Sequence, residues 1–180
     1  MATPTALPAT FVAGDVLTAA QMNGLRGAFR VLQTISTAKL DTFSLTSSVT
    51  TPTDVTGLSV TITPSATSSK ILIIANCAIG VSSGSFGFAR IAGGNAATYI
   101  GNAAGSRIQA AQGLITASAS TMGTHMVYLD SPSTTSATTY KVQIYCTGGA
   151  NIHVNRSHDD TDSNAYVRAA SSITVMEISA

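Results

Sequence analysis

The run at residues 155–164 (NRSHDDTDSN) holds the densest cluster of chemically active side chains in the sequence. Oxygen-bearing side chains recur at every second position, at Asp160, Asp162 and Asn164, which is the spacing of the first ligands in a calcium loop. The run lacks the glycine and the distal glutamate of an EF-hand, so only an irregular cation site is left. We favour a turn in which Asp and Asn side chains bond nearby backbone N–H groups, with Arg156 paired to one carboxylate.

The histidines show no pattern that would build a catalytic or metal site. His125, His153 and His158 have none of the spacings of a metal site such as HExxH. His125 and His153 alternate with apolar neighbours, so we interpret them as structural side chains in strands. The clustered acids all lie in one loop, so the paired carboxylates of a glycosidase are not identifiable. We therefore predict that the protein is not an enzyme and that it holds no metal and no cofactor.

Tyrosines beside polar side chains are the remaining candidates for ligand binding. A sugar site would place exposed aromatic rings beside Asn, Asp and Arg, but the sequence has no Trp and only 6% aromatic residues. The candidate receptor-facing residues are Tyr99, Asn102, Arg107, Asn164 and Tyr166.

The composition excludes several classes of partner. Charged residues make up 9% of the chain, against roughly 25% in an average soluble domain. The formal net charge is +1 and no basic cluster is present, so we expect neither nucleic-acid binding nor binding to an anionic membrane. The longest strongly apolar run, at residues 71–79, is far shorter than the roughly 20 residues of a membrane helix. No signal peptide is indicated at residues 1–10, so synthesis in a cytoplasm is expected.

The first thirty-five residues differ in kind from the rest of the chain. Prolines keep residues 1–17 extended, and Thr18 with Gln21 forms a capping box that predicts a helix over residues 18–40. Apolar residues spaced three or four positions apart form one stripe along the surface of that predicted helix. Its members are Met22, Leu25, Phe29, Leu32 and Ile35. The stripe either folds back on the rest of the chain or packs in a parallel bundle with sister chains, and we favour the bundle.

Residues 41–180 show period-two patterns separated by Ser, Thr, Gly and Pro turns. This spacing predicts a mainly β domain, an antiparallel jelly-roll-like β-sandwich preceded by the short N-terminal α-helix. The predicted strands are 44–50, 56–63, 70–81, 86–91, 97–101, 122–130, 139–146, 151–155 and 172–178. Residues 103–120 form either a long loop or another irregular strand.

The strand predicted at residues 70–81 is apolar on both faces. One face carries isoleucines, and the other carries Leu72, Ile74 and Ala78, whereas a sandwich strand normally turns a polar face outward. A subunit interface explains the second apolar face. Cys77 and Cys146 occupy apolar positions in the alternating patterns of their predicted strands. We therefore expect two reduced core thiols rather than a disulfide or a metal pair.

Several segments resemble proteins of tailed bacteriophages. Residues 11–23 (FVAGDVLTAAQMN) resemble the N-terminal motif of many tail-fibre and tail-appendage proteins. Five later segments resemble, in the same order, phage structural proteins common among viruses of aquatic bacteria. These are residues 101–107 (GNAAGSR), 129–132 (LDSP), 139–143 (TYKVQ), 154–157 (VNRS) and 172–178 (SITVMEI).

The resemblance implies a homotrimeric structural fibre of the virion. Its N-terminus would dock to tail, baseplate or capsid proteins, and its β head would face the host surface, where a glycan or protein is the receptor. The docking role would fall on Phe11, Gly14, Asp15, Leu17, Met22 and Asn23. A capsid decoration or head-fibre protein without host contact is the alternative, and a glycan depolymerase spike is a third.

Overall fold

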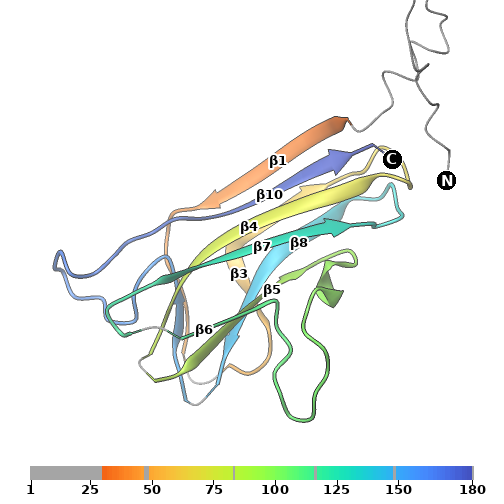
Figure 1. Ribbon diagram of the computed structural model, residues 1–180. Helices are drawn as coiled ribbons and strands as arrows, with labels where there is room; N and C mark the ends of the chain where they lie inside the picture. Colours follow the sequence, from red (N-terminus) through yellow and green to blue (C-terminus); the bar gives the residue numbers. More distant parts are fainter. Residues whose placement is uncertain (1–29, 47–48, 83, 116, 148, 180) are drawn as a thin grey trace, which may run out of the picture.

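The computed structural model describes residues 30–46, 49–82, 84–115, 117–147 and 149–179. These residues form ten strands in two antiparallel sheets, so the predicted mainly β class is confirmed (Figure 1). The six-stranded sheet has the order β1 (Val31–Lys39), β10 (Ser171–Ile178), β4 (Lys70–Val81), β9 (Ile152–Val154) and β2 (Phe43–Leu45), with β7 (Met122–Asp130) also paired to β4. The four-stranded sheet has the order β3 (Thr53–Ile62), β8 (Thr138–Cys146), β5 (Phe86–Ala92) and β6 (Gln112–Ile115).

The inner faces of the two sheets share one core. Alternate residues of β4, among them Ile71 and Ile73, are fully buried and belong to the same apolar cluster as Leu58 of β3 and Ile144 of β8. This alternation follows from the strand geometry, which points successive side chains to opposite faces. Because apolar residues occupy every second position, the sequence alone predicted most strands.

Both cysteines are free and buried, as predicted. Cys77 lies on β4 and Cys146 on β8, and each side chain is part of the shared core. Burial raises the pKa of the Cys77 thiol to about 12, so this side chain behaves as a small apolar group at neutral pH.

The helix predicted over residues 18–40 is wrong where the structure tests it. Residues 31–39 form β1, which pairs along its length with β10, and residues 18–29 lie outside the described part of the chain. Leu32 and Ile35 are three residues apart, so the predicted apolar stripe of the helix continued into a segment that is rich in β-branched residues. Pairing with β10 outweighs that local spacing. Among the described residues, the β structure therefore begins at β1 rather than after residue 40.

The segment between β5 and β7 also differs from prediction. In place of the strand expected at 97–101, the chain forms a single 3₁₀ turn, η1 (Ala96–Thr98). Within residues 103–120, which were left open between a loop and a strand, the structure has a loop followed by the short strand β6. The described residues contain no helix long and apolar enough to cross a membrane.

One buried carboxylate interrupts the apolar inner face of β10. Glu177 is fully buried, and its Oε1 accepts hydrogen bonds from the Ser65 N–H (2.7 Å) and hydroxyl (2.6 Å) and from Ser69 Oγ (2.7 Å). Its Oε2 accepts one from Gln33 Nε2 of β1 (2.6 Å). Burial alone would raise the pKa of Glu177, but these donors lower it to about 2. The carboxylate thus ties the end of β10 to β1 and to the connection before β4.

Candidate functional surfaces

The loop between β9 and β10, residues 155–170, is fixed at its base by Asn155. This residue has a φ of +63°, a left-handed conformation that Asn adopts more readily than most residues. Its buried Nδ2 donates to the carbonyl oxygens of Lys39 (2.8 Å) and Asp41 (2.9 Å), and its Oδ1 accepts from Ser171 Oγ (2.6 Å). Because Asn155 and Ser171 stand at the two ends of the loop, their bond closes it.

A chain of hydrogen bonds joins Arg156 to two histidines at the base of the loop. Arg156 Nη2 lies 2.9 Å from Nδ1 of the buried His153; a guanidinium only donates, so this nitrogen accepts and the ring proton is placed on Nε2. His153 Nε2 then donates to His158 Nδ1 over 3.1 Å. Burial, followed by the charges of Arg156 and His158, lowers the pKa of His153 to about 4. His153 is therefore neutral at neutral pH. Its place in β9, buried and hydrogen-bonded through both ring nitrogens, agrees with the structural strand residue that the sequence predicted.

Asp160 lies between two arginines. Arg156 Nη1 is 2.9 Å from Asp160 Oδ2, and Arg168 Nη1 forms an ion pair with Oδ1. The hydrogen bond from Arg168 and the charges of both arginines lower the pKa of Asp160. The predicted pairing of Arg156 with a carboxylate of this run is thus confirmed. Across the described residues, no group of three or more His, Cys, Asp or Glu side chains is placed to hold a metal ion.

A concavity of about 240 Å³ opens on the same loop. Its lining combines carboxylates, hydroxyls, a guanidinium and one aromatic ring, which are groups that can hydrogen-bond a polyhydroxylated ligand. The lining residues are Asp160, Thr161, Asp162, Ser163, Tyr166, Val167 and Arg168. Tyr166 is half-buried there, whereas the neighbouring Asn164 is exposed and does not line the concavity.

The other three candidate receptor-facing residues lie elsewhere. Tyr99 is partly buried, with its ring stacked on that of Tyr128 at a centroid distance of 5.1 Å, so it offers no exposed platform. Asn102 and Arg107 are exposed in the loop between η1 and β6, where Arg107 Nη1 donates to the Ala104 carbonyl (3.2 Å). Figure 1 shows this loop (green) well separated from the loop at residues 155–170 (blue). The five candidates therefore do not form one site.

Residues 80–84 (GVSSG) have the G-x-S-x-G spacing of a nucleophile elbow, a feature that the sequence analysis missed. An elbow needs a strand followed by a helix, but this segment joins β4 to the strand β5. The Ser82 hydroxyl accepts from the Asn151 N–H (2.8 Å) and lies 3.3 Å from the Asn151 carbonyl oxygen. Ser82 therefore bonds the neighbouring backbone, in the wrong context for a nucleophile.

The outward face of the six-stranded sheet carries a second candidate surface. We define the outer patch as Leu72, Ile74, Val127, Leu129 and Met176. Ile74, Val127 and Leu129 are 40%, 55% and 51% exposed, and the other two are half-buried. The strand register places these five side chains in two rows that run across β1, β10, β4 and β7, together with polar residues of β1 and β10. One row is Thr34, Met176, Leu72 and Leu129, and the next is Ser36, Thr174, Ile74 and Val127.

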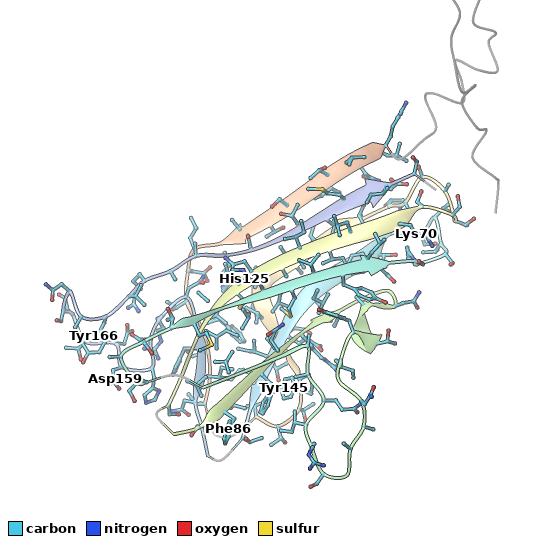
Figure 2. The ribbon with its side chains drawn as sticks, in the orientation of Figure 1. Lys70, Phe86, His125, Tyr145, Asp159 and Tyr166 are labelled. Carbon is cyan, nitrogen blue, oxygen red and sulfur yellow. The ribbon has the colours of Figure 1, made fainter. Side chains whose placement is uncertain are left out.

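The sequence analysis found only part of this surface. It placed Leu72, Ile74 and Ala78 on a second apolar face of β4; Leu72 and Ile74 do lie there, while Ala78 is buried. Val127, Leu129 and Met176 were not predicted to belong to it, although both faces of β7 carry apolar residues. Figure 2 labels Lys70 and His125, which mark the two ends of this part of the sheet.

The predicted anchor and bundle residues are mostly untested. Two stripe residues are described: Leu32 is 38% exposed on β1, and Ile35 packs against the core opposite Val175. Ile35 is therefore a partly buried strand residue that packs against the core, rather than part of a helix. The remaining ones, Phe11, Gly14, Asp15, Leu17, Met22, Asn23, Leu25 and Phe29, lie outside the described residues.

No protein-family model matches this chain, and no curated protein matches it in sequence.

Proposed function

We propose that this chain is a structural fibre protein of a tailed-phage virion, that it works as a homotrimer, and that it is not an enzyme. The observation that carries the proposal is the outer patch. An antiparallel sheet normally turns polar side chains to water, whereas this one turns a contiguous set of apolar ones outward. Such a surface is typical of a protein that is built into an assembly, and the resemblance to phage structural proteins supplies the kind of assembly.

The proposed architecture is a jelly-roll-like β-sandwich head. Two antiparallel sheets around one core support it. The five later segments that resemble phage proteins fall within strands β8 and β10, at the ends of β7 and β9, and in the loop between η1 and β6, whereas residues 11–23 lie outside the described residues. They are therefore part of the β head and of its connections.

The head has two ends with different proposed roles. Val31, at the start of β1, pairs with Ile178, whereas Lys39 at the other end pairs with Ser171, directly after the loop at residues 155–170. Figure 1 shows that loop at the end of the sheet opposite the start of β1. We propose that residues 1–17 dock to the tail or baseplate and that the loop at residues 155–170 faces the host. Its concavity, with Tyr166 and Asp162, suits a surface glycan.

Antibodies against the purified chain test the proposal on virions of the phage that encodes it. We expect immunogold label at the tail tip or baseplate, and purified chain added first should reduce phage adsorption to host cells. Label over the capsid, with no effect on adsorption, would instead support the decoration or head-fibre alternative. Virions without label would overturn both assignments.

Two further measurements separate adhesion from a depolymerase. Incubation of the chain with host surface glycan should release no reducing ends, and measurable release would establish the spike enzyme instead. Tyr166→Ala should weaken binding to host cells, while Arg107→Ala, in the other exposed loop, should leave it unchanged. Equal binding by both variants would remove the loop at residues 155–170 from the proposal.

A further inference from the structure

We infer that the outer patch is the surface through which the folded β domain binds a second copy of this chain. The inference deepens the homo-oligomer part of the proposed function and does not depend on adhesion or on the phage assignment. It places the contact on the six-stranded sheet, and it extends the second apolar face predicted for residues 70–81 to the neighbouring strands β7 and β10.

The register makes the patch continuous. Leu72 of β4 stands between Met176 of β10 and Leu129 of β7, and Ile74 stands beside Val127 in the next row. Directly opposed side chains on antiparallel strands lie about 5 Å apart, so these residues form one apolar surface rather than separate exposures. On the outward face of the four-stranded sheet, Phe86 of β5 is also exposed, but the neighbouring Phe88 is partly buried and stacks on the buried Tyr145, with ring centroids 5.3 Å apart.

The composition of the face favours a copy of itself as the partner. Beside the apolar rows, the face carries Ser36 and Thr174, whose hydroxyls lie 2.8 Å apart, and none of the residues in these rows is ionised. Two such faces can meet without burying an unpaired charge, which is the main penalty in a polar interface. A partner recognised by charge would need ionised groups here.

The face is large enough for a stable contact. Four strands spaced about 4.8 Å apart, with about 3.3 Å per residue over the eight residues of β10, give a plane of roughly 500 Å². Two such planes in contact would bury about 1,000 Å² in total, which is near the lower bound for a specific protein interface. Lys70, whose Nζ donates to Ser131 Oγ (2.8 Å), marks the polar margin at one end.

Thiol reactivity and molar mass together test the inference on the full chain. Both native cysteines are buried, so a single introduced cysteine reports its own surroundings. Val127→Cys probes the patch and Phe86→Cys is the matched control, because the two native side chains are 55% and 54% exposed. We expect a mass that is a multiple of the 18.2 kDa chain, with the thiol at position 127 reacting with a maleimide about tenfold more slowly than the one at position 86.

Each other outcome overturns the inference in an identifiable way. A monomer with two equally reactive thiols would leave the patch free for another protein. A monomer with a protected thiol at position 127 would mean that the chain's own N-terminal residues cover the patch. An oligomer in which both thiols react equally fast would place the contact elsewhere. None of these results bears on virion labelling, so failure here is distinct from failure of the phage assignment.

A charge substitution provides the second test. Val127→Glu should raise the dissociation constant of the oligomer roughly 30-fold or more, because the carboxylate would be buried against an apolar partner. Phe86→Glu should leave the dissociation constant unchanged. Circular dichroism should show that both variants keep the β structure, and an unchanged dissociation constant in folded Val127→Glu would overturn the inference.

Discussion

The outward faces of the two sheets follow the same alternation but carry different residues. On the four-stranded sheet, Lys141 Nζ lies 2.6 Å from Asp54 Oδ2, and Gln143 bonds both Asp54 (2.6 Å) and Arg90 (2.8 Å). This charged network spans β3, β8 and β5. On the six-stranded sheet, the equivalent positions of β4, β7 and β10 carry the outer patch.

The difference indicates which of the two outward faces is suited to contact with water. Exposed apolar area costs about 25 cal/mol per Å², so leaving several large aliphatic side chains outward is unfavourable unless a partner covers them. The polar network on the four-stranded sheet has no such cost and gains little from burial. The two faces therefore predict different responses to substitution, to pH and to protein concentration.

The largest contrast is expected between two adjacent residues of β4. Ile73 is fully buried in the core, and Ile74 is 40% exposed in the outer patch. Ile73→Ala should lower the free energy of unfolding by about 3 to 4 kcal/mol at every protein concentration, because it leaves a cavity. Ile74→Ala should cost about 1 kcal/mol, with a loss that grows with concentration as the oligomer forms. Denaturant unfolding at two concentrations measures both, and equal, concentration-independent losses would contradict the contrast.

Acid should act mainly through Glu177, a buried carboxylate of the six-stranded sheet. The pKa of Glu177 is lowered from 4.5 to about 2 in the folded chain, so its contribution to stability is present above pH 4.5 and is lost as the pH falls toward 2. The loss should reach about 3 kcal/mol. Glu177→Gln should flatten this part of the curve of unfolding free energy against pH. A variant that kept the wild-type slope there would show that the hydrogen bonds to Glu177 do not hold its charge.

His153, on β9 of the same sheet, should cause a second loss of stability at higher pH. Its pKa is lowered from 6.5 to about 4, so the unfolded chain gains a proton first and stability falls as the pH drops from 6.5 toward 4. The loss should be about 2 kcal/mol by pH 5. His153→Asn should remove that slope while leaving the Glu177 window below pH 4.5 intact. Persistence of the slope in the variant would assign it to other groups.

Local patterns predicted most of the strands, and pairing between distant segments decided the rest. The strands β4, β7, β8 and β10 are visible in sequence because each is a short run with apolar residues at alternate positions, between segments rich in turn residues. The spacing of Leu32 and Ile35 fits a helix as well as a strand, and only the pairing of β1 with β10, far along the chain, settles it. The outer patch has the same origin, since Val127 and Met176 join Leu72 and Ile74 through register alone.

The candidate ligand site shows the same division. The pairing of Arg156 with a carboxylate follows from the sequence because both lie in one loop. The position of Tyr99 against Tyr128 does not, because it depends on how the connection after β5 packs beside β7. The sequence therefore locates the polar loop with its Tyr166, but it does not establish that Tyr99 packs against Tyr128, away from that loop.

The smallest effect is expected on the polar face. Hydrogen bonds from Lys141 and Gln143 lower the pKa of Asp54, but the carboxylate is half-exposed, so solvent and salt screen the interaction. Asp54→Asn should lower the free energy of unfolding by less than about 1 kcal/mol, and added salt should shrink the difference. The molar mass should not change, because this face takes no part in the contact between copies. A shift in oligomeric state caused by Asp54→Asn would mean that the four-stranded sheet, and not the outer patch, faces the second copy.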